Sequence, residues 1–272
     1  MSLYQKAEHL MRTYRVFPKK YLGQNFVVDE QFLQLMSSYA SVGRSDVVLE
    51  VGAGFGFLTC LLAQKSRKVI AVEADARLMT ALQNELGGFD NAELIEGNIL
   101  KVAIPPFDKV VSNPPFSISS PLLFWLLKRT FNCAVLTFQK EFARRLDTPI
   151  GSKDYGRLTV STSYHVEVEL LDNVPKEAFY PPPDVDVVIV RLIPKRLAPF
   201  KVEDEEVFDE VVQTLFTQRN RKVRNAVLPL LRKYGLKGTA AVKRADVLPF
   251  HNKRVRDLAP EDFGALANEL ST

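Results

Sequence analysis

A short apolar run, Val47–Val51, leads directly into the glycine-rich segment Gly52-Ala53-Gly54-Phe55-Gly56. Such a run followed by glycines predicts a buried strand that ends in a tight turn. The next segment, Leu58–Ala63, is typical of a helix. A strand, a glycine turn and a helix in this order indicate the start of an alternating α/β fold.

The alternation continues along the chain. Further strands are predicted at Lys68–Val72, Ala92–Ile95, Lys109–Ser112 and Ala134–Phe138. Helices are predicted at Ala76–Leu86, capped by Asp75, and at Ser120–Leu127, capped by Ser120. Strands that alternate with helices predict a doubly wound parallel sheet with helices on both faces, which is a Rossmann-like α/β fold.

The pattern changes after Gly156. Leu158–Val174 and Val185–Leu192 are rich in β-branched residues, and we expect them to form an antiparallel edge of the sheet. Beyond the prolines at 194 and 199 the chain is typical of short helices, predicted at Glu203–Thr217, Lys222–Lys233, Thr239–Ala245 and Pro260–Leu270. The sequence therefore predicts two domains, a larger one over residues 1–196 and a small all-helical one over residues 197–272.

Charge is unevenly distributed along the 272 residues. Residues 191–272 hold 16 of the 36 Lys and Arg residues but 11 of the 32 Asp and Glu residues. This excess predicts that the helical domain meets phosphate. Neither an apolar run of membrane length nor a signal peptide is evident. Cys60 and Cys133 form neither a disulfide framework nor a metal-ligand pattern, so we expect no metal and a reducing compartment, the cytoplasm.

The glycine turn is a candidate ligand site. Glycine at positions 52 and 54 lets the backbone approach a ligand closely. Glu73 ends the following strand, where a carboxylate can accept hydrogen bonds from both hydroxyls of a ribose. The same arrangement serves NAD, although the GxGxG spacing differs from the GxGxxG of dinucleotide sites. Asn98 ends the third strand, where it can contact the adenine of a nucleoside cofactor.

The segment Asn113-Pro114-Pro115-Phe116 follows the fourth strand, at the same edge of the sheet. An adenine amino group is a poor nucleophile because its lone pair is delocalised into the ring. Two acceptors on its N–H groups favour a tetrahedral nitrogen and stabilise the developing positive charge. The side-chain oxygen of Asn113 and the carbonyl of Pro114 are candidate acceptors, and Phe116 is a candidate platform on which the base stacks.

These motifs resemble the small-subunit ribosomal RNA adenine dimethyltransferases. The resemblance covers nearly the whole chain. It extends over Tyr21-Leu22-Gly23-Gln24-Asn25-Phe26, Leu49 to Gly56, Ala71-Val72-Glu73, Asn113 to Phe116, Gln139-Lys140-Glu141, Tyr155 to Leu158, Phe179 to Pro183 and Gln218 to Lys222. Together these motifs are far more specific than any one of them.

The resemblance implies a class I methyltransferase with S-adenosylmethionine as cofactor. The reaction would place two methyl groups on N6 of each of two adjacent adenosines, in a hairpin loop near the 3′ end of small-subunit rRNA. Asn113, Pro114 and Phe116 would be catalytic, and Phe179 would cover the other face of the base. The cofactor would be contacted by Gln24, Asn25, Val27, Gly52, Gly54, Glu73, Ala74, Asn98, Ile99 and Asn113.

The chain departs from the family pattern at a few positions. The family usually has Asp where Asn98 stands, and many members have Leu and Tyr where Pro114 and Phe116 stand. Asp184 replaces a common Lys near the expected RNA path. We expect Asn98 to weaken the contact with the cofactor adenine. The chemistry is expected to survive the change at Phe116, which keeps the aromatic face and loses only a hydroxyl.

Several basic segments are candidates for RNA binding. The expected contacts are Lys19, Lys20, Lys153, Arg157, Arg219, Arg221, Lys222 and Arg224. Phosphate contacts would position the RNA while the base pocket selects adenine. The expected partner is small-subunit rRNA within a pre-ribosomal particle, bound by a monomer that contacts no membrane.

Other functions remain open at this stage. DNA adenine methyltransferases and enzymes that methylate protein glutamine share the Asn-Pro-Pro-Phe segment, and large-subunit rRNA is a further possible target. A non-enzymatic reading, an RNA-binding assembly factor that kept the fold, also remains. The helical tail and the Gln218–Arg224 segment favour the small-subunit rRNA enzyme.

Overall fold

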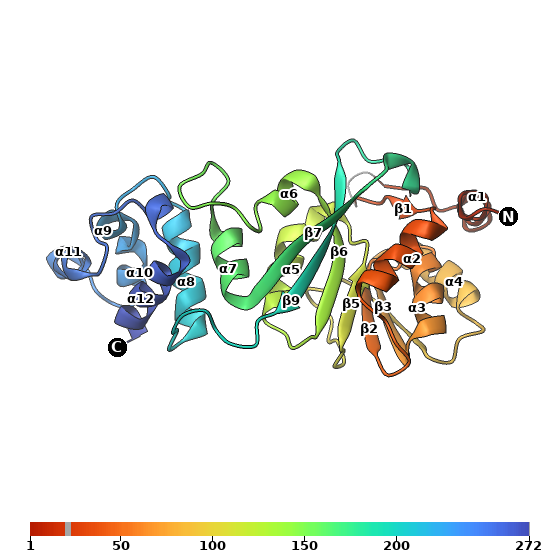
Figure 1. Cartoon of the computed structure of the whole chain (residues 1–272), viewed down its shortest axis with the longest axis horizontal. Coiled ribbons are helices and arrows are strands. Elements are labelled where there is room, and N and C mark those ends of the chain that lie inside the picture. The colour runs from red at the N-terminus through yellow and green to blue at the C-terminus, as the bar shows by residue number, and fades with distance from the viewer. Residues whose placement is uncertain (20–22, 272) are drawn as a thin grey trace. The chain divides into compact units, whose positions relative to one another are not determined.

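A computed structural model describes residues 1–19 and 23–271 of the chain (Figure 1). It divides into two compact units. The first comprises Met1–Ala143 and Val168–Pro194, and the second comprises Arg144–Glu167 and Lys195–Thr272. Within the described ranges, no helix is both long enough and apolar enough to cross a membrane.

The first unit is built on a seven-stranded sheet with the order β4-β3-β2-β5-β6-β9-β7. Its strands are β2 (Val47–Val51), β3 (Lys68–Glu73), β4 (Ala92–Glu96), β5 (Lys109–Ser112), β6 (Cys133–Gln139), β7 (Val166–Val174) and β9 (Val187–Pro194). The strands from β4 to β6 are parallel to their neighbours, whereas β9 is antiparallel to β6. The predicted doubly wound α/β fold is confirmed.

The chain reverses its direction across the sheet next to β2. From β2 it moves outward to β3 and β4, and it then returns to β5 on the other side of β2. Such a reversal opens a crevice at the carboxyl ends of the strands, which is where open α/β sheets bind ligands.

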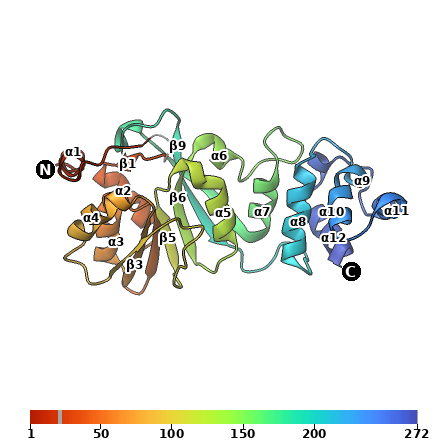
Figure 2. The same ribbon diagram turned by 180° about the vertical axis from the view of Figure 1, so that it is seen from behind.

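Helices cover both faces of this sheet. On one face lie α2 (Glu30–Tyr39), α3 (Phe57–Lys65) and α4 (Ala76–Glu85), which share an apolar core with the sheet. On the other face lies α5 (Ser119–Leu127), seen in front of the sheet in Figure 2. The strands β2, β3, β5 and β6 are almost wholly buried, as their continuous apolar runs predict.

A second, two-stranded sheet was not expected from the sequence. In it, β1 (Phe26–Val27) pairs with β8 (Phe179–Tyr180) in antiparallel fashion. Before it lies α1 (Leu3–Tyr14), and the 3-10 turn η3 (Lys176–Ala178) leads into β8. Strands of two residues are too short to show a periodic pattern in the sequence. This pair nevertheless holds in place the segment around Asn25, which lines the cavity described below.

The second unit is a helical bundle. Its helices are α7 (Arg157–His165), α8 (Glu205–Phe216), α9 (Val223–Ala226), α10 (Leu228–Lys233), α11 (Gly238–Val247) and α12 (Pro260–Ser271). The 3-10 turn η4 (Val255–Asp257) also lies in this unit, and the short α6 (Lys140–Arg144) spans the point where the chain passes from the first unit into the second. Phe208, Leu215 and Phe263 are fully buried in its core.

Residues 144–167 belong to this helical unit, whereas the sequence had assigned them to the larger domain. Tyr155 is 1% exposed, and its hydroxyl donates to the Leu258 carbonyl over 2.8 Å. Val160 and Tyr164 lie in the same core as Phe208. Because its buried side chains lie in the core of the helical unit, this segment belongs to that unit, although most of β7 and all of β9, which belong to the first unit, follow it in the chain.

Three local predictions were wrong. Residues 158–165 lie in the helix α7 and not in a strand, because Val160 and Tyr164, four residues apart on one helix face, pack into the core of the helical unit. A 3-10 turn, η2 (Phe116–Ile118), precedes α5, so Ser120 lies inside that helix and does not cap it. The predicted helix over 222–233 is two helices, with Pro229 in the first turn of the second.

Candidate active site

One cavity lies at the carboxyl edge of the sheet, where β2, β3, β4 and β5 end. It collects residues that are far apart in the chain. Its lining includes Gln24, Asn25, Val27, Gly52, Gly54, Glu73, Ala74, Asn98, Ile99, Asn113, Pro114 and Phe116. All the residues predicted to contact the cofactor, and all those predicted to be catalytic, therefore face one space.

The glycine turn after β2 is closely packed. Gly52 has φ +80°, and a Cβ on it would lie 3.0 Å from Cδ of Pro115. Gly54 has φ +60°, and a Cβ on it would meet the Phe26 ring at 3.0 Å. A side chain at either position would be strained and would fill space beside the cavity, so this turn requires glycine.

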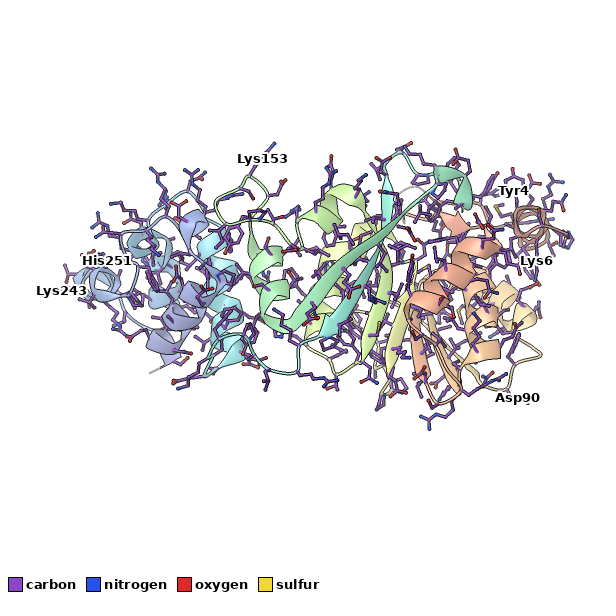
Figure 3. All side chains as sticks on the ribbon, in the orientation of Figure 1. Tyr4, Lys6, Asp90, Lys153, Lys243 and His251 are labelled. Carbon is purple, nitrogen blue, oxygen red and sulfur yellow. The ribbon has the colours of Figure 1, made fainter. Side chains whose placement is uncertain are left out.

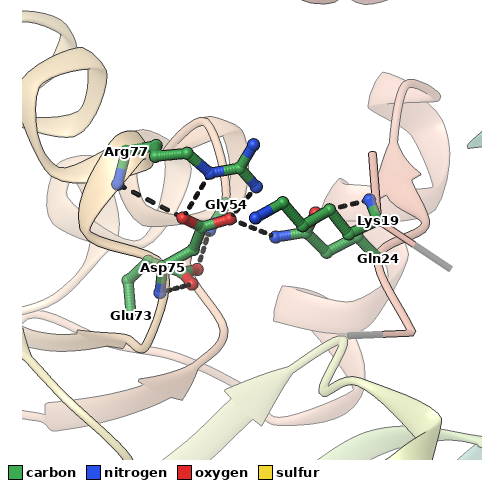
Figure 4. A network of polar contacts seen from close by, with 6 residues as sticks. All are labelled: Lys19, Gln24, Gly54, Glu73, Asp75 and Arg77. Atoms are coloured by element: carbon green, nitrogen blue, oxygen red, sulfur yellow. Dashed lines mark hydrogen bonds and ion pairs between the residues drawn. The ribbon is translucent and has the colours of Figure 1, made fainter. Parts of the chain in front are cut away.

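Glu73 ends β3 with its carboxylate fixed at the cavity (Figure 4). Its Oε2 accepts a hydrogen bond from the Gly54 N–H at 2.9 Å, and its Oε1 accepts one from the Asp75 N–H at 2.8 Å. Burial raises the pKa of Glu73, while these backbone donors oppose the shift. Each carboxylate oxygen has a second lone pair, so the group can also accept from two hydroxyls of a ligand.

Asp75 joins this turn to the N-terminal segment. Arg77 donates to its Oδ1 at 2.8 Å and lowers the pKa of Asp75 to about 2. Gln24 donates from Nε2 to Oδ2 of Asp75 at 2.9 Å and accepts from the Lys19 N–H at 2.9 Å. As predicted, Asp75 also caps α4. The network in Figure 4 thus holds the segment around Gln24 at the cavity, a link that the sequence did not reveal.

Asn98 follows β4 and lies at the wall of the cavity beside Ile99. Its Oδ1 accepts from the Leu100 N–H at 2.9 Å, which turns the chain after the strand. The neighbouring Gly97 N–H donates to the Glu73 carbonyl at 2.8 Å. The ends of β3 and β4 are therefore tied together where the cavity is formed.

Asn113 follows β5 and is held by its side-chain amide. Its Nδ2 donates to the Asn25 carbonyl at 3.0 Å, and its Oδ1 accepts from the Thr137 hydroxyl at 2.5 Å. The preceding Ser112 fixes the strand itself, because its hydroxyl donates to the Val51 carbonyl of β2 at 2.5 Å. Asn113 consequently presents an oriented amide at the cavity, which the glycine turn and Phe116 also line.

Phe179 does not line the cavity in the structure. Its side chain is 2% exposed and packs against the Phe32 ring, with the centroids 5.8 Å apart. Its contact with a substrate base stays a prediction. Lys20, together with Tyr21 and Leu22 of the resemblance motif, lies outside the described residues.

The predicted basic contacts Arg219, Arg221, Lys222 and Arg224 gather in the helical unit. The Arg219 guanidinium donates to the carbonyls of Lys153 and Ser152, at 2.6 and 3.0 Å. Lys153 itself points outward (Figure 3). Arg157 is partly buried, and this burial lowers its pKa. Arg157 and Arg219 thus also serve the packing of their own unit.

A second basic segment lies beside the first. Lys222 and Arg254 form an antiparallel bridge, and the Val255 N–H donates to the Arg221 carbonyl at 3.0 Å. Lys253, Arg254 and Arg256 are thereby brought next to Arg219–Arg224. The sequence reasoning missed them, although their spacing in Lys253-Arg254-Val255-Arg256 was visible.

The family is shown by comparison with known proteins. A family model described as "Ribosomal RNA adenine dimethylase" matches residues 17–271 of the chain. The chain belongs to the ribosomal RNA adenine dimethylase family. The match takes in both the residues of the cavity and the helical unit, so the dimethylase resemblance drawn from the motifs is confirmed.

Individual relatives are similar in sequence to this chain over most of their length. A "probable ribosomal RNA small subunit methyltransferase A" from Methanosarcina mazei is 44% identical over 250 residues, which cover 91% of each chain. One of the same name from Pyrococcus abyssi is 39% identical over 264 residues, covering 96% of this dimethylase and 95% of that relative.

Solved structures carry the same fold. A dimethyladenosine transferase from Plasmodium falciparum has a TM-score of 0.76 and 31% identity, and the match covers 90% of this dimethylase and 97% of that chain. The 23S rRNA methyltransferase ErmE has a TM-score of 0.63 and 30% identity, with coverage of 91% and 100%. At this coverage, both similarities reach into both compact units of this dimethylase.

Metal ligands do not form part of the described site. In residues 1–19 and 23–271, no group of three or more His, Cys, Asp or Glu side chains is arranged to hold a metal ion. The polar residues that line the cavity include Glu73, Asn113 and Gln24.

Proposed function

We propose that this dimethylase binds S-adenosylmethionine in the cavity and transfers methyl groups to N6 of two adjacent adenosines of small-subunit rRNA. The observation that carries the proposal is that Glu73 and Asn113 line one cavity at the point where the sheet reverses direction. The carboxylate suits a ribose and the amide suits an adenine amino group, so one space accommodates donor and acceptor of the methyl group.

The residues around the glycine turn fit the cofactor. Glu73 offers two fixed oxygens for a pair of ribose hydroxyls, and the turn leaves the space that a Cβ at Gly52 or Gly54 would fill. When bound, S-adenosylmethionine supplies an electrophilic methyl group on a sulfonium. Ile99, which is 2% exposed, adds an apolar surface beside Asn98 for an adenine ring.

Asn113 and Pro114 act on the substrate adenine. The Asn113 Oδ1 and the Pro114 carbonyl accept hydrogen bonds from the two N–H groups of N6, which localises the lone pair and stabilises the positive charge on nitrogen. No strong base is needed, because the alkylated nitrogen loses its proton readily to water. Phe116 stacks on the base, a contact worth about 1–3 kcal/mol.

The relatives favour small-subunit rRNA as the target, and the basic segments favour RNA of any kind. The relatives from Methanosarcina mazei and Pyrococcus abyssi are named for the small subunit and share more of this sequence than ErmE, named for 23S rRNA. The basic segments of the helical unit suit phosphate. We also propose that the target adenosines lie in a hairpin near the 3′ end and that the RNA is bound within a pre-ribosomal particle. The enzyme is proposed to act as a monomer in the cytoplasm.

Methyl transfer to isolated ribosomal particles tests this function. The protein is incubated with labelled S-adenosylmethionine and small subunits that lack dimethyladenosine, and the digested nucleosides are analysed by mass. We expect dimethyladenosine at two neighbouring positions with the unmutated protein and none with Asn113→Ala. Parallel incubations contain large-subunit rRNA or duplex DNA in place of small subunits, and label in one of these alone would assign a different target. Cofactor binding without any transfer would refute the proposed reaction.

A further inference from the structure

The two ends of the Asn113 amide have different partners. Nδ2 lies 3.0 Å from the Asn25 carbonyl, and Oδ1 lies 2.5 Å from the Thr137 hydroxyl. A backbone carbonyl only accepts hydrogen bonds, so it is the NH₂ end that must face Asn25. The oxygen end then faces Thr137, and the hydroxyl has to be the donor of that bond.

Thr137 is held in place by the strands on both sides of it. It lies near the end of β6 and pairs with Ile189 of β9, while the preceding Leu136 pairs with Ser112 of β5. This register places Thr137 beside Asn113, the residue after Ser112. Thr137 is 0% exposed, and its branched Cβ restricts χ1, so the position of its hydroxyl is well defined.

The geometry points to Thr137 as a positioning residue for methyl transfer: its buried hydroxyl holds the Asn113 oxygen where the adenine amino group is received. The inference rests on the proposed function, in which Asn113 accepts from N6–H. Thr137 is not among the described residues that line the cavity, so it acts through Asn113 and touches neither base nor cofactor.

The chemistry gives this hydroxyl a purpose beyond packing. A carbonyl oxygen has two lone pairs; Thr137 takes one and leaves the other directed at the base. The terminal torsion of an Asn side chain is broad, and the Asn25 bond alone restrains only the nitrogen end. If the Asn113 oxygen is displaced from the position where it accepts from N6, methyl transfer is slowed more than binding of the substrate adenine is weakened.

Two substitutions at one position separate orientation from packing. Thr137→Val removes the donor and keeps the shape, and Thr137→Ser keeps the donor and removes a methyl group. We expect the single-turnover rate of Thr137→Val to fall about 10- to 100-fold, because a small misplacement of a group that acts on the reacting atom can slow a reaction by up to about 100-fold. We expect Thr137→Ser to stay within about threefold of the unmutated rate, with S-adenosylmethionine Kd changed less than about twofold in both.

Ser66→Ala serves as the matched control. Ser66 is also buried in the first unit, and its hydroxyl donates to the Leu62 carbonyl at 2.7 Å, at the end of α3 that lies away from the glycine turn. The Ser66→Ala variant loses one buried hydroxyl without disturbing Asn113. We expect its melting temperature to drop and its transfer rate to remain that of the unmutated protein.

The outcomes distinguish failure of the proposed function from failure of the positioning role of Thr137. If the unmutated protein does not methylate small subunits, the proposed function fails. If the unmutated protein methylates small subunits and Thr137→Val is equally fast, the positioning role fails while the function stands. The same holds if Thr137→Ser is as slow as Thr137→Val and both lose cofactor affinity in parallel. A slow Thr137→Val with normal cofactor affinity, rescued by serine, supports it.

Discussion

The Glu73 carboxylate accepts a hydrogen bond from the Gly54 backbone N–H at 2.9 Å, which joins the end of β3 to the glycine turn after β2. Its second oxygen accepts from the Asp75 N–H at 2.8 Å. One buried side chain therefore shapes the turn and also supplies the acceptors proposed for the ribose. We expect the charge and the geometry of Glu73 to make separable contributions to cofactor binding.

Glu73→Gln is expected to weaken cofactor binding. The amide keeps the shape but must turn an NH₂ group toward one of the two backbone donors. Hydrogen bonds to a charged group are worth about 1.5–3 kcal/mol, so we expect the affinity for S-adenosylmethionine to fall about 10- to 100-fold. Calorimetric titration measures it, and RNA affinity, measured separately, should stay unchanged. A cofactor affinity equal to that of the unmutated protein would contradict the role of the charge.

Glu50 makes the stability of the protein depend on pH. It lies in β2 and is 2% exposed; burial raises its pKa to about 8, the Thr59 hydroxyl opposes this, and the charge of Glu73 adds to it. The folded pKa exceeds the unfolded value of about 4.3, so folding favours the protonated form. The stabilisation is fully present below pH of about 4.3 and is lost as the pH rises through about 8.

Glu50→Gln tests this dependence, because glutamine has the same shape and no ionisable proton. We expect the melting temperature of the unmutated protein to decline relative to Glu50→Gln between about pH 5 and pH 8. Thermal melts of both proteins over this range measure the difference, in which the other titrating groups largely cancel. A difference that does not change with pH would show that Glu50 does not titrate in this window.

Much of the fold could be predicted because buried parallel strands have a plain signature. Val47–Val51 and Ala134–Phe138 are continuous apolar runs that end at turn residues, and both are strands. Leu158–His165 misled the prediction because its β-branched residues suit a strand locally. In the chain it is a helix whose Val160 and Tyr164 are buried against Phe208, so tertiary packing outweighs local preference.

The candidate site could be predicted to the level of its lining, since Glu73, Asn98 and Asn113 each follow a strand and parallel strands end at one edge. The contacts that orient these residues could not. The bonds from Asn113 to Asn25 and Thr137 join residues 88 and 24 positions apart, and they depend on strand register. No local pattern records that register, and the two-residue strand β1, which positions Asn25, has no periodicity to detect.

Gly52→Ala is expected to abolish cofactor binding with little loss of fold. The residue has φ +80°, and an added Cβ would lie 3.0 Å from the Pro115 ring, which belongs to the segment proposed to be catalytic. The turn or the proline must shift, and either movement changes the cavity. Calorimetry should detect no binding of S-adenosylmethionine, while circular dichroism should retain the helical signal. Gly88→Ala is the control, because a Cβ there meets nothing within 4 Å.

Arg219 and Arg221 are two positions apart but differ in what their side chains do. The Arg219 guanidinium donates to the Lys153 and Ser152 carbonyls at 2.6 and 3.0 Å, whereas the Arg221 side chain is exposed beside the bridge between Lys222 and Arg254. We therefore expect Arg219→Ala to lower the melting temperature, since hydrogen bonds from a charged donor are worth about 1.5–3 kcal/mol each.

Arg221→Ala should act on RNA binding and leave the melting temperature unchanged. Loss of one phosphate contact lowers the slope of log affinity against log salt by roughly 0.7–0.9. Titrations of rRNA at several potassium chloride concentrations measure this slope, and thermal melts of both variants complete the comparison. An unchanged slope for Arg221→Ala would remove Arg221 from the RNA contacts, and the neighbouring Arg254→Ala would then show whether the second basic segment makes the phosphate contact instead.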